Sequence, residues 1–474
     1  MSTPEVHDLV VIGGGPGGYA AALYGAAAGL SVAVVEMEKV GGTCLHRGCI
    51  PAKEFLETAT VLRTVAGAKE FGVQSTQPTV DFGISQARKQ KVVDQLHRGL
   101  EGLMRSRSIT IVPGRGQLLA EVRDGARVVR VAGEASGPEE LLGRHVILAM
   151  GSVPRTIPGF EVDGRLVMTS DEVLDLSEIP GSVAVIGGGA IGCEFASMLS
   201  DLGSQVTVLE VLPQLLVNCD RDVAEVVARS FRRRGVVVHT GVSVTGHTPN
   251  GTGTTVHFGD GQSAHVDAVV VSVGRRPLSE GALEAGSGVE VDDRGYVVVD
   301  DHMRTAAPGV YAVGDVVSTP QLAHVGFAEA IVAVKDLMGE VAVPVDYARV
   351  PWGIYCNPEV AYAGYSEDGA TAAGFEVVVK KDPYGGNSRA RIIGETDGLV
   401  KVIAERRSDG GAGRLLGVHM VGPWVTEQLG QGYLSVNWEA TPEEVGQFIQ
   451  PHPTLSEAFG ETVLALTGRG LHVG

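Results

Sequence analysis

The chain has 474 residues, of which 44 % are hydrophobic and 20 % charged, a balance typical of a globular protein with about two to four domains. Its formal net charge of −18 argues against nucleic acid as a partner, because phosphate binding needs a basic face. Five cysteines are too few for a secreted disulfide framework, and the N-terminal MSTPEVHD lacks the basic region of a signal peptide. We therefore expect a cytoplasmic protein.

The first long apolar stretch, residues 9–35, contains no Asp, Glu, Lys or Arg and is long enough to cross a bilayer. It also holds Pro16 and seven glycines, five of which lie within residues 13–18. This composition predicts a strand, a turn and a buried helix rather than a membrane span, so we expect no membrane partner.

Residues 8–36 read as an apolar strand, a glycine cluster, an alanine-rich helix and a second apolar strand that ends at Glu36. The steric roles of the glycines are distinct: Gly13 allows the tight turn, Gly15 lets backbone approach a pyrophosphate, and Gly18 lets the helix pack on its strand. The helix N-terminus offers free N–H groups to phosphate, and the glutamate can accept hydrogen bonds from ribose hydroxyls.

Residues 182–210 repeat this plan in the same length, which makes a pair of dinucleotide sites far more specific than one isolated glycine motif. The corresponding residues of the second unit are Gly187, Gly189, Gly192 and Glu210. A 2′-phosphate would be repelled by Glu210, and the first basic residue after it is Arg221. The second site is therefore predicted to bind NAD rather than NADP.

Three further apolar strands, within residues 145–151, 267–277 and 309–315, each end in glycine or aspartate. The third places Asp315 at the carboxyl end of a strand, where open α/β sheets bind ligands. Residues 351–474 carry no nucleotide fingerprint and suggest a mixed α/β C-terminal domain.

The stretch GGTCLHRGCIPAK, residues 41–53, contains Cys44 and Cys49. Their spacing alone fits a metal loop, a structural staple or a redox centre. A zinc module fails on ligand count, because no second Cys/His pair lies at zinc spacing, and no metal site is predicted. The other three cysteines, Cys193, Cys219 and Cys356, are expected to be buried packing residues.

With these features the chain resembles the flavoprotein disulfide reductases, class I of the pyridine nucleotide-disulfide oxidoreductases, over essentially its whole length. The cysteine stretch and HPTLSE, residues 452–457, are the most specific motifs, and HPTLSE is most similar to the dihydrolipoamide dehydrogenases of that family. The other motifs that carry the resemblance lie at residues 13–22, 187–196, 271–277, 311–315, 322–324 and 357–364.

The resemblance implies an α/β fold with two Rossmann-like domains, for FAD and NAD, and a mixed α/β dimerisation domain at the C-terminus. It divides the chain into a first part of the FAD domain (1–150), an NAD domain (151–279), a central return to the FAD domain (280–350) and an interface domain (351–474). It also implies a homodimer.

The resemblance assigns cofactor-binding residues by position. Gly13, Gly15, Gly18, Glu36, Gly116, Asp315 and the Leu322–Ala323–His324 helix start are expected to hold FAD. Lys53 is expected beside the flavin, paired with Glu194. Gly187, Gly189, Gly192, Glu210, Val242 and Gly274 are expected to contact NAD.

The same resemblance implies the reaction, oxidation of protein-bound dihydrolipoamide with transfer of hydride to NAD⁺. Cys44 would exchange with substrate, Cys49 would face the flavin, and His452, oriented by Glu457, would reach the partner chain's disulfide and accept the substrate proton. Thiolates are the nucleophiles of disulfide exchange, so a base that titrates near neutral pH is needed. The expected partners are lipoyl domains of an acyltransferase or of a glycine cleavage carrier protein.

Three alternatives stay open from the sequence. One is an NAD(P)H-dependent reductase of another disulfide; a second is a reductase of mercuric ion, although the tail GRGLHVG lacks a cysteine pair; and a third is a non-catalytic flavoprotein sensor.

His46 and Arg47 stand where the family often has Asn-Val, and an added positive charge at Arg47 predicts a slightly more oxidising disulfide.

Overall fold

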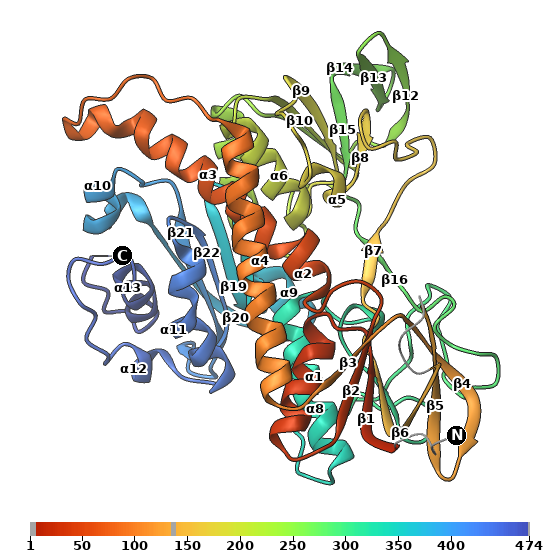
Figure 1. Cartoon of the computed structure of the whole chain (residues 1–474). Helices are drawn as coiled ribbons and strands as arrows, with labels where there is room; N and C mark the ends of the chain where they lie inside the picture. Colours follow the sequence, from red (N-terminus) through yellow and green to blue (C-terminus); the bar gives the residue numbers. More distant parts are fainter. Residues whose placement is uncertain (1–5, 134–138, 473–474) are drawn as a thin grey trace. The chain divides into compact units, whose positions relative to one another are not determined.

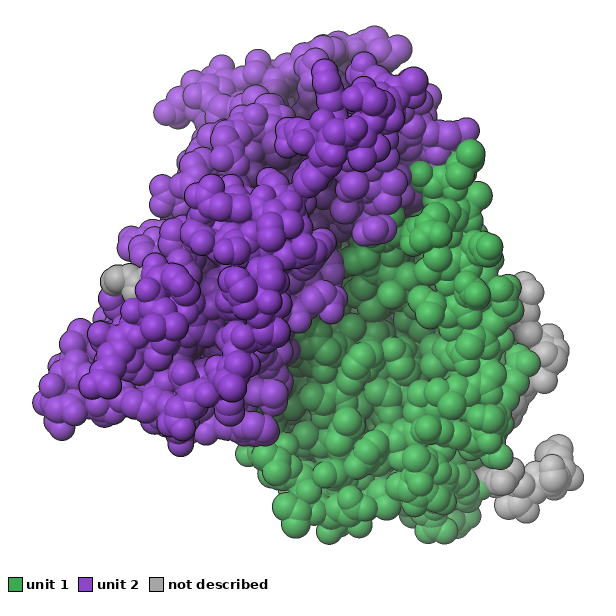
Figure 2. Space-filling view, turned by 90° about the vertical axis from the view of Figure 1, so that its left-hand side faces the viewer, with its two compact units in different colours: residues 1–54, 83–155, 274–347 green, residues 55–82, 156–273, 348–474 purple. Residues whose placement is uncertain are grey.

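The computed structural model describes residues 6–133 and 139–472 (Figure 1). Its contacts group the chain into two compact units (Figure 2). Unit 1 comprises residues 1–54, 83–155 and 274–347, and unit 2 comprises residues 55–82, 156–273 and 348–474. The four-region division expected from the sequence stays a prediction, since these units are defined by contacts alone.

Unit 1 is built on a seven-stranded sheet with the strand order β3-β2-β1-β6-β5-β4, with β17 paired to β6. The β1, β2, β3, β6 and β17 pairings are parallel, whereas β4, β5 and β6 form an antiparallel meander. The strands are β1 (Val6–Ile12), β2 (Val32–Glu36), β3 (Thr110–Pro113), β4 (Arg115–Arg123), β5 (Ala126–Ala132), β6 (Glu140–Leu148) and β17 (Val310–Ala312). A short antiparallel pair, β7 (Ser152–Pro154) and β16 (Arg275–Pro277), completes the unit.

Alternate residues of β1 point to opposite faces of this sheet, as the strand period requires. Leu9 and Val11 pack in the cluster that includes helices α1 (Pro16–Ala27) and α8 (Ala323–Leu337), and Val10 and Ile12 pack in the cluster on the other face. Both faces are apolar, which explains why β1 reads as a continuous hydrophobic run. The remaining helices of unit 1 are α2 (Gly42–Arg47), the first turns of α3 (Cys49–Gly67), most of α4 (Phe82–Ser106) and the 3-10 turn η2 (Gly314–Val316).

Unit 2 contains a second parallel sheet with the order β11-β10-β9-β15-β8, and a small antiparallel sheet, β12-β13-β14. The parallel strands are β8 (Val167–Met168), β9 (Ser182–Ile186), β10 (Gln205–Glu210), β11 (Val237–Thr240) and β15 (Ala268–Val271), with helices α5 (Ser170–Val173), α6 (Ala190–Asp201) and α7 (Arg221–Arg233). The antiparallel strands are β12 (Val244–Asn250), β13 (Gly253–Phe258) and β14 (Gln262–Val266).

The C-terminal part of unit 2 is a five-stranded antiparallel sheet with the order β18-β19-β22-β21-β20. Its strands are β18 (Trp352–Ile354), β19 (Glu359–Gly364), β20 (Val377–Pro383), β21 (Leu399–Arg406) and β22 (Ala412–Gly422). Helices α11 (Val425–Asn437) and α13 (Glu457–Leu466) share its core, and the shorter helical segments of unit 2 are η1 (Ala68–Phe71), α9 (Glu367–Ala372), η3 (Tyr384–Gly386), α10 (Ser388–Ile393) and α12 (Pro442–Val445).

The predicted fold class is confirmed: two Rossmann-like sheets and a mixed α/β C-terminal part. The apolar stretch 9–35 divides into β1, α1 and β2, as its glycines indicated. Among the described residues, no helix is both long and apolar enough to span a membrane.

Candidate active site

The first glycine turn lies between β1 and α1 and matches the steric roles expected of its residues. Gly13 has a φ of +100°, and a Cβ there would lie 2.3 Å from the backbone oxygen of Ala149. A Cβ at Gly18 would lie 1.8 Å from Gly13 O, so only glycine allows helix and strand to approach this closely. Gly15 is different: of the atoms in the described part of the chain, a Cβ added there would have only Gly42 Cα within 4 Å, at 3.9 Å. The turn therefore leaves open backbone at Gly15, at an N-cap without a side-chain hydrogen bond.

Glu36 closes the first unit at the end of β2. Its buried carboxylate accepts hydrogen bonds from Gly14 N at 2.6 Å and from Glu38 N at 2.8 Å, which fixes it beside the glycine turn. A cavity of about 330 Å³ adjoins this strand end. The described residues that line it are Met37, Pro113, Gly114, Arg115, Ala132 and Gly133. Gly116 itself packs into the core, with a Cβ position 2.8 Å from Ile12 Cγ2, so the cavity lies next to this predicted residue.

The two cysteines occupy consecutive helices directly after this turn. Cys44 lies in α2, Cys49 is the first residue of α3, and both are partly buried thiols. Gly42 packs so closely on Gly15 that its Cβ would be 2.6 Å from Gly15 Cα. The cysteine helix is therefore built directly against the open backbone of the first glycine turn.

The thiols of Cys44 and Cys49 interact with each other and with a nearby cation. The hydrogen bond to Cys49 raises the pKa of Cys44, and burial raises it further, whereas the charge of Lys53 lowers it. Burial and then the two cysteines raise the pKa of Tyr19, on α1, to about 12. Tyr19 thus belongs to the surroundings of the pair, although nothing in the sequence distinguishes it from an ordinary helix residue.

Arg47, whose charge predicted a more oxidising disulfide, has an acidic partner, and the prediction stays untested by this contact. Its guanidinium pairs with Glu38 at 2.8 Å on an exposed edge of the loop. The charge of Lys53, one turn into α3, lowers the pKa of Cys44. Because Arg47 is partly neutralised by Glu38, we expect its effect on the disulfide to be weaker than its position between the cysteines indicates.

Asp315 lies in η2, at the carboxyl end of β17. Its Oδ2 accepts a hydrogen bond from the hydroxyl of Ser152 at 2.5 Å, and Arg275 Nε lies 3.8 Å from it. Arg275 also donates to Ser152 Oγ at 2.7 Å. Sequence reasoning assigned neither residue a role. Ser152 directly follows the stretch 145–151, and Arg275 lies within 267–277. Helix α8 begins nearby in sequence at Ala323, within the predicted Leu322–His324 start.

The second glycine turn, in unit 2, repeats the geometry of the first. Gly187 has a φ of +105° and a Cβ position 2.4 Å from Ser272 O, and a Cβ at Gly192 would lie 1.9 Å from Gly187 O. A Cβ at Gly189 would meet nothing within 4 Å among the described residues. The buried Glu210 accepts from Gly188 N at 2.5 Å and from Leu212 N at 2.7 Å.

The remaining predicted cofactor residues are dispersed. Val242 donates its N–H to Glu210 O at 3.0 Å, which places it beside the second glutamate. Gly274, in unit 1, has a φ of +104° and accepts from Arg155 N at 2.9 Å. Glu194 is buried in α6 and accepts from Tyr355 N at 2.9 Å. The pairing of Glu194 with Lys53 joins residues of different units and stays a prediction.

His452 and Glu457 are brought together at the start of α13. His452 Nδ1 lies 2.8 Å from Glu457 Oε1, and Thr454 N donates to the other carboxylate oxygen at 2.7 Å. The Glu457 side chain is 21 % exposed and that of His452 is 70 % exposed. A carboxylate that accepts from Nδ1–H leaves Nε2 as the free basic nitrogen, directed away from the pair.

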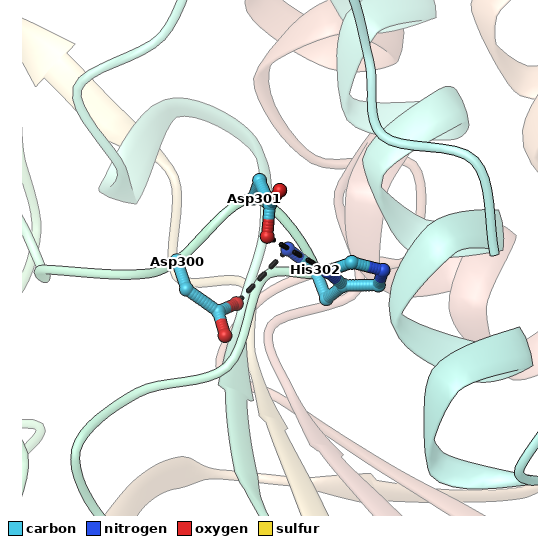
Figure 3. Close-up of side chains that lie close together, drawn as sticks. All are labelled: Asp300, Asp301 and His302. Carbon is cyan, nitrogen blue, oxygen red and sulfur yellow. Dashed lines mark hydrogen bonds and ion pairs between the residues drawn. The ribbon is translucent and has the colours of Figure 1, made fainter.

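The remaining cysteines and one acidic cluster do not extend this site. Burial raises the pKa of Cys193, Cys219 and Cys356, as expected of packing thiols. Asp300, Asp301 and His302 lie together on a turn (Figure 3). Asp300 accepts from the backbone of His302 at 2.9 Å and of Arg304 at 2.9 Å, so it stabilises the turn itself. The cationic Arg304 beside it disfavours a metal ion there.

Two glycine turns of the dinucleotide-binding type, with a cysteine pair built onto the first, define a disulfide oxidoreductase that uses nucleotide cofactors. The chain belongs to the pyridine nucleotide-disulphide oxidoreductase family, which matches residues 7–330, and the dimerisation domain of that family matches residues 350–463. The predicted cofactors, FAD and NAD, are those of this family.

Individual relatives agree with this assignment. The chain is 41 % identical to a dihydrolipoyl dehydrogenase of Bacillus subtilis, over 98 % of this chain and 99 % of the relative. It is 34 % identical to the mitochondrial dihydrolipoyl dehydrogenase of Pisum sativum, over 100 % and 94 %. Among solved structures, LpdA from Mycobacterium tuberculosis matches with a TM-score of 0.89 at 26 % identity, covering 97 % of this chain and 99 % of that one. The HOCl-induced flavoprotein disulfide reductase RclA from Escherichia coli matches with a TM-score of 0.84 at 27 % identity, over 96 % and 99 %.

Proposed function

We propose that this protein is a dihydrolipoyl dehydrogenase that oxidises protein-bound dihydrolipoamide through Cys44 and Cys49 and delivers the electrons to NAD⁺. The observation that carries the proposal is the pair of interacting thiols on α2 and α3, built against the first glycine turn with Lys53 beside it. Relatives of nearly equal length with this name support the choice of substrate.

The residues present fit both cofactors. In unit 1, the open backbone at Gly15 and the uncapped start of α1 would receive the pyrophosphate of FAD, and the open hollow at the end of β2, lined by Met37 and Pro113, would receive its adenosine. In unit 2, Gly189 and α6 offer the same features to NAD, and the carboxylate of Glu210 disfavours a 2′-phosphate. When bound, FAD would accept the electron pair and NAD⁺ would receive it as hydride.

The chain's own chemistry is thiol–disulfide exchange. A substrate thiolate attacks Cys44 Sγ, the Cys44–Cys49 bond breaks, and Cys49 leaves as a thiolate. The second substrate thiol then attacks its own sulfur in the mixed disulfide, which releases lipoamide and leaves Cys44 reduced. Lys53 supplies positive charge near the thiolate, in agreement with its effect on the pKa of Cys44.

The proton of the substrate thiol needs a base, and the contact of His452 with Glu457 supports His452 in this role. Glu457 accepts from Nδ1, holds the ring and would stabilise its cation. The match to the dimerisation domain supports a homodimer in which the partner subunit's His452 serves the cysteine pair of the first protomer. The proposal includes lipoyl domains as partners and a cytoplasmic location, where reducing conditions would keep the three buried cysteines as thiols.

The deciding experiment compares NAD⁺ with NADP⁺ in steady-state oxidation of dihydrolipoamide by the purified protein, together with the flavin absorbance spectrum. We expect a flavin spectrum and turnover with NAD⁺ at least about tenfold above NADP⁺ in kcat/KM. A flavin spectrum with turnover of another dithiol, and none with dihydrolipoamide, would contradict the substrate and favour an NADH-linked reductase of a different disulfide. The similarity to the E. coli disulfide reductase makes that outcome worth measuring in the same assay.

A further inference from the structure

Two histidine rings of unit 1 meet at one backbone carbonyl. His46 Nε2 lies 3.0 Å from Val40 O, and His97 Nδ1 lies 3.1 Å from the same oxygen. The rings are 5.1 Å apart and arranged edge to face at 69°. His46 lies on α2 between the two cysteines, and His97 lies on α4, so two helices are tied to one acceptor.

Val40 connects the cysteine helix to the first glycine turn. The residue is only 2 % exposed, so its carbonyl depends on protein donors. Among the described residues, the two rings are the hydrogen-bond donors that Val40 O has. The next residue, Gly41, donates its N–H to Gly14 O at 2.8 Å. The peptide group between Val40 and Gly41, directly before α2, is therefore bonded to the rings through its oxygen and to the glycine turn through its N–H.

The geometry assigns the tautomers. A carbonyl only accepts, so His46 must carry hydrogen on Nε2 and His97 on Nδ1. The other nitrogen of His97, Nε2, lies 3.8 Å from Glu101 Oε1. Burial lowers the pKa of His46, the bond to Val40 raises it, and the charges of His97, Lys39 and Arg47 lower it. His46 therefore acts as a neutral donor, and the charged groups around it are Lys39, Arg47 with its partner Glu38, and Glu101 beside the ring of His97.

We propose that His46 and His97 are positioning residues that share Val40 O and hold α2, and with it Cys44, in the place from which the Cys44–Cys49 disulfide forms. The inference rests on the proposed function of this pair in disulfide exchange. A held helix raises the effective concentration of one thiol at the other, and intramolecular disulfides are favoured by that restriction. Loss of either donor leaves a buried carbonyl underbonded and frees α2.

The test measures the equilibrium between the cysteine pair and a dithiothreitol redox buffer in the purified holoenzyme, without lipoamide or NAD. In this exchange the two thiols lose two electrons and two protons to oxidised dithiothreitol. Trapping of the free thiols followed by mass spectrometry of the peptide 41–53 gives the disulfide's equilibrium constant. We expect His46→Leu and His97→Leu each to lower it by three- to tenfold, which is a shift of about 15 to 30 mV toward a more oxidising pair.

Conservative replacements distinguish positioning from a general loss of packing. His46→Gln places an amide donor near the position of Nε2, and His97→Asn places one near Nδ1. Each is expected to return the constant to within about twofold of the native value. The double variant His46→Leu/His97→Leu is expected to show less than the sum of the single effects, because both rings serve one acceptor. His145→Leu is the matched control, since His145 is a half-buried histidine of the same unit on β6.

The outcomes separate this inference from the proposed function. Leucine variants that fold with a native disulfide constant overturn it, as do amide variants that behave like the leucine variants, or a control that shifts equally. If the leucine variants do not fold, the amide variants alone decide, and a shift above threefold in a folded amide variant overturns it. A native enzyme that fails to oxidise dihydrolipoamide would count against the proposed substrate and leave this equilibrium measurable.

Discussion

The two glycine units of this chain are nearly identical in geometry and differ in the segments that come after them. In both, the first glycine has a φ near +100°, and a Cβ added to the last glycine would lie within 2 Å of the first one's oxygen. In both units the glutamate at the end of the second strand accepts a hydrogen bond from the N–H of the second glycine of the turn, Gly14 or Gly188. The carbonyl oxygen of that same glycine accepts from the chain that follows the glutamate, from Gly41 N in the first unit and from Leu216 N in the second. The shared part builds a nucleotide site.

The returning segments then diverge. After Glu36 the chain reaches α2 within a few residues and places the cysteine pair on the glycine turn. After Glu210 it reaches Asp220, the N-cap of α7, which is 2 % exposed and paired with the equally buried Lys401 at 2.9 Å. The same strand–turn–helix–strand unit is thus followed by the cysteine pair in its first copy and by a buried ion pair in its second. We therefore expect mutations to affect the reactive site and the stabilising ion pair separately.

Cysteine replacement should show the largest contrast. We expect Cys49→Ser to lower NAD⁺ reduction by dihydrolipoamide at least about 1000-fold, because the exchange needs both sulfurs, with an unchanged unfolding temperature. Cys193→Ser, in the second glycine helix, replaces the thiol that contacts Gly188 O with a hydroxyl that can donate to the same oxygen, and should retain activity within about twofold. Comparable losses of activity in both variants, measured in a steady-state assay with thermal unfolding in parallel, would contradict this difference between the two units.

Lys401→Met should have the opposite effect. It leaves Asp220 buried without its cation, and we expect the free energy of unfolding to fall by about 3 to 5 kcal/mol in denaturant titrations. Activity per folded molecule should be unchanged, since the cysteine pair lies in the other unit. Lys401 also pairs with Asp222, at 2.7 Å, and so does Lys381, at 3.2 Å. The control Lys381→Met removes this second cation, which is 49 % exposed, and should lower the free energy of unfolding by less than about 1 kcal/mol.

Alanine substitutions at two glycines of the second turn should affect different quantities: the stability of the protein in one case and NAD⁺ binding in the other. Gly192→Ala forces a Cβ to 1.9 Å from Gly187 O and should destabilise the protein by about 2 to 3 kcal/mol. Gly189→Ala enters open space with an ordinary φ of −74°, so stability should be kept while the KM for NAD⁺ rises about tenfold. A lowered unfolding temperature for Gly189→Ala with an unchanged KM would show that this glycine serves packing instead.

Acid should destabilise unit 2 through His419, which lies near the Asp220–Lys401 pair. Burial lowers the pKa of His419 to about 4, against partial compensation from Asp220. The unfolded ring binds protons from about pH 6.5 downward and the folded ring does not, so stability present at pH 7 is lost as the pH falls toward 4. The loss by pH 5 should be about 2 kcal/mol. Chemical unfolding at both pH values should show a smaller slope for His419→Gln, but not for His265→Gln, an exposed control.

Local motifs carried most of what the sequence could predict. The glycine turns, the glutamates and the His452–Glu457 bond join residues close together along the chain, where spacing and residue type decide the geometry. The residues missed are long-range partners: Ser152 and Arg275 beside Asp315, and His97 opposite His46. No spacing rule brings residues 57 positions apart to one carbonyl, as the fold does for His97 and Val40. Arg47 shows the same limit, because its charge was evident and its partner Glu38 was not.

The bond between Val40 and Gly41 has a mechanical consequence. A peptide group is planar, so its C=O and N–H turn together as one rigid plate. On one edge of this plate, His46 and His97 hold the oxygen, and on the other, Gly14 O holds the hydrogen. A rotation that released the histidines would also withdraw the donor from the glycine turn. An insertion or deletion between Glu36 and Gly42 would therefore disturb the nucleotide cradle and the reactive sulfurs at once, so we expect the length of this segment to tolerate less change in evolution than its sequence.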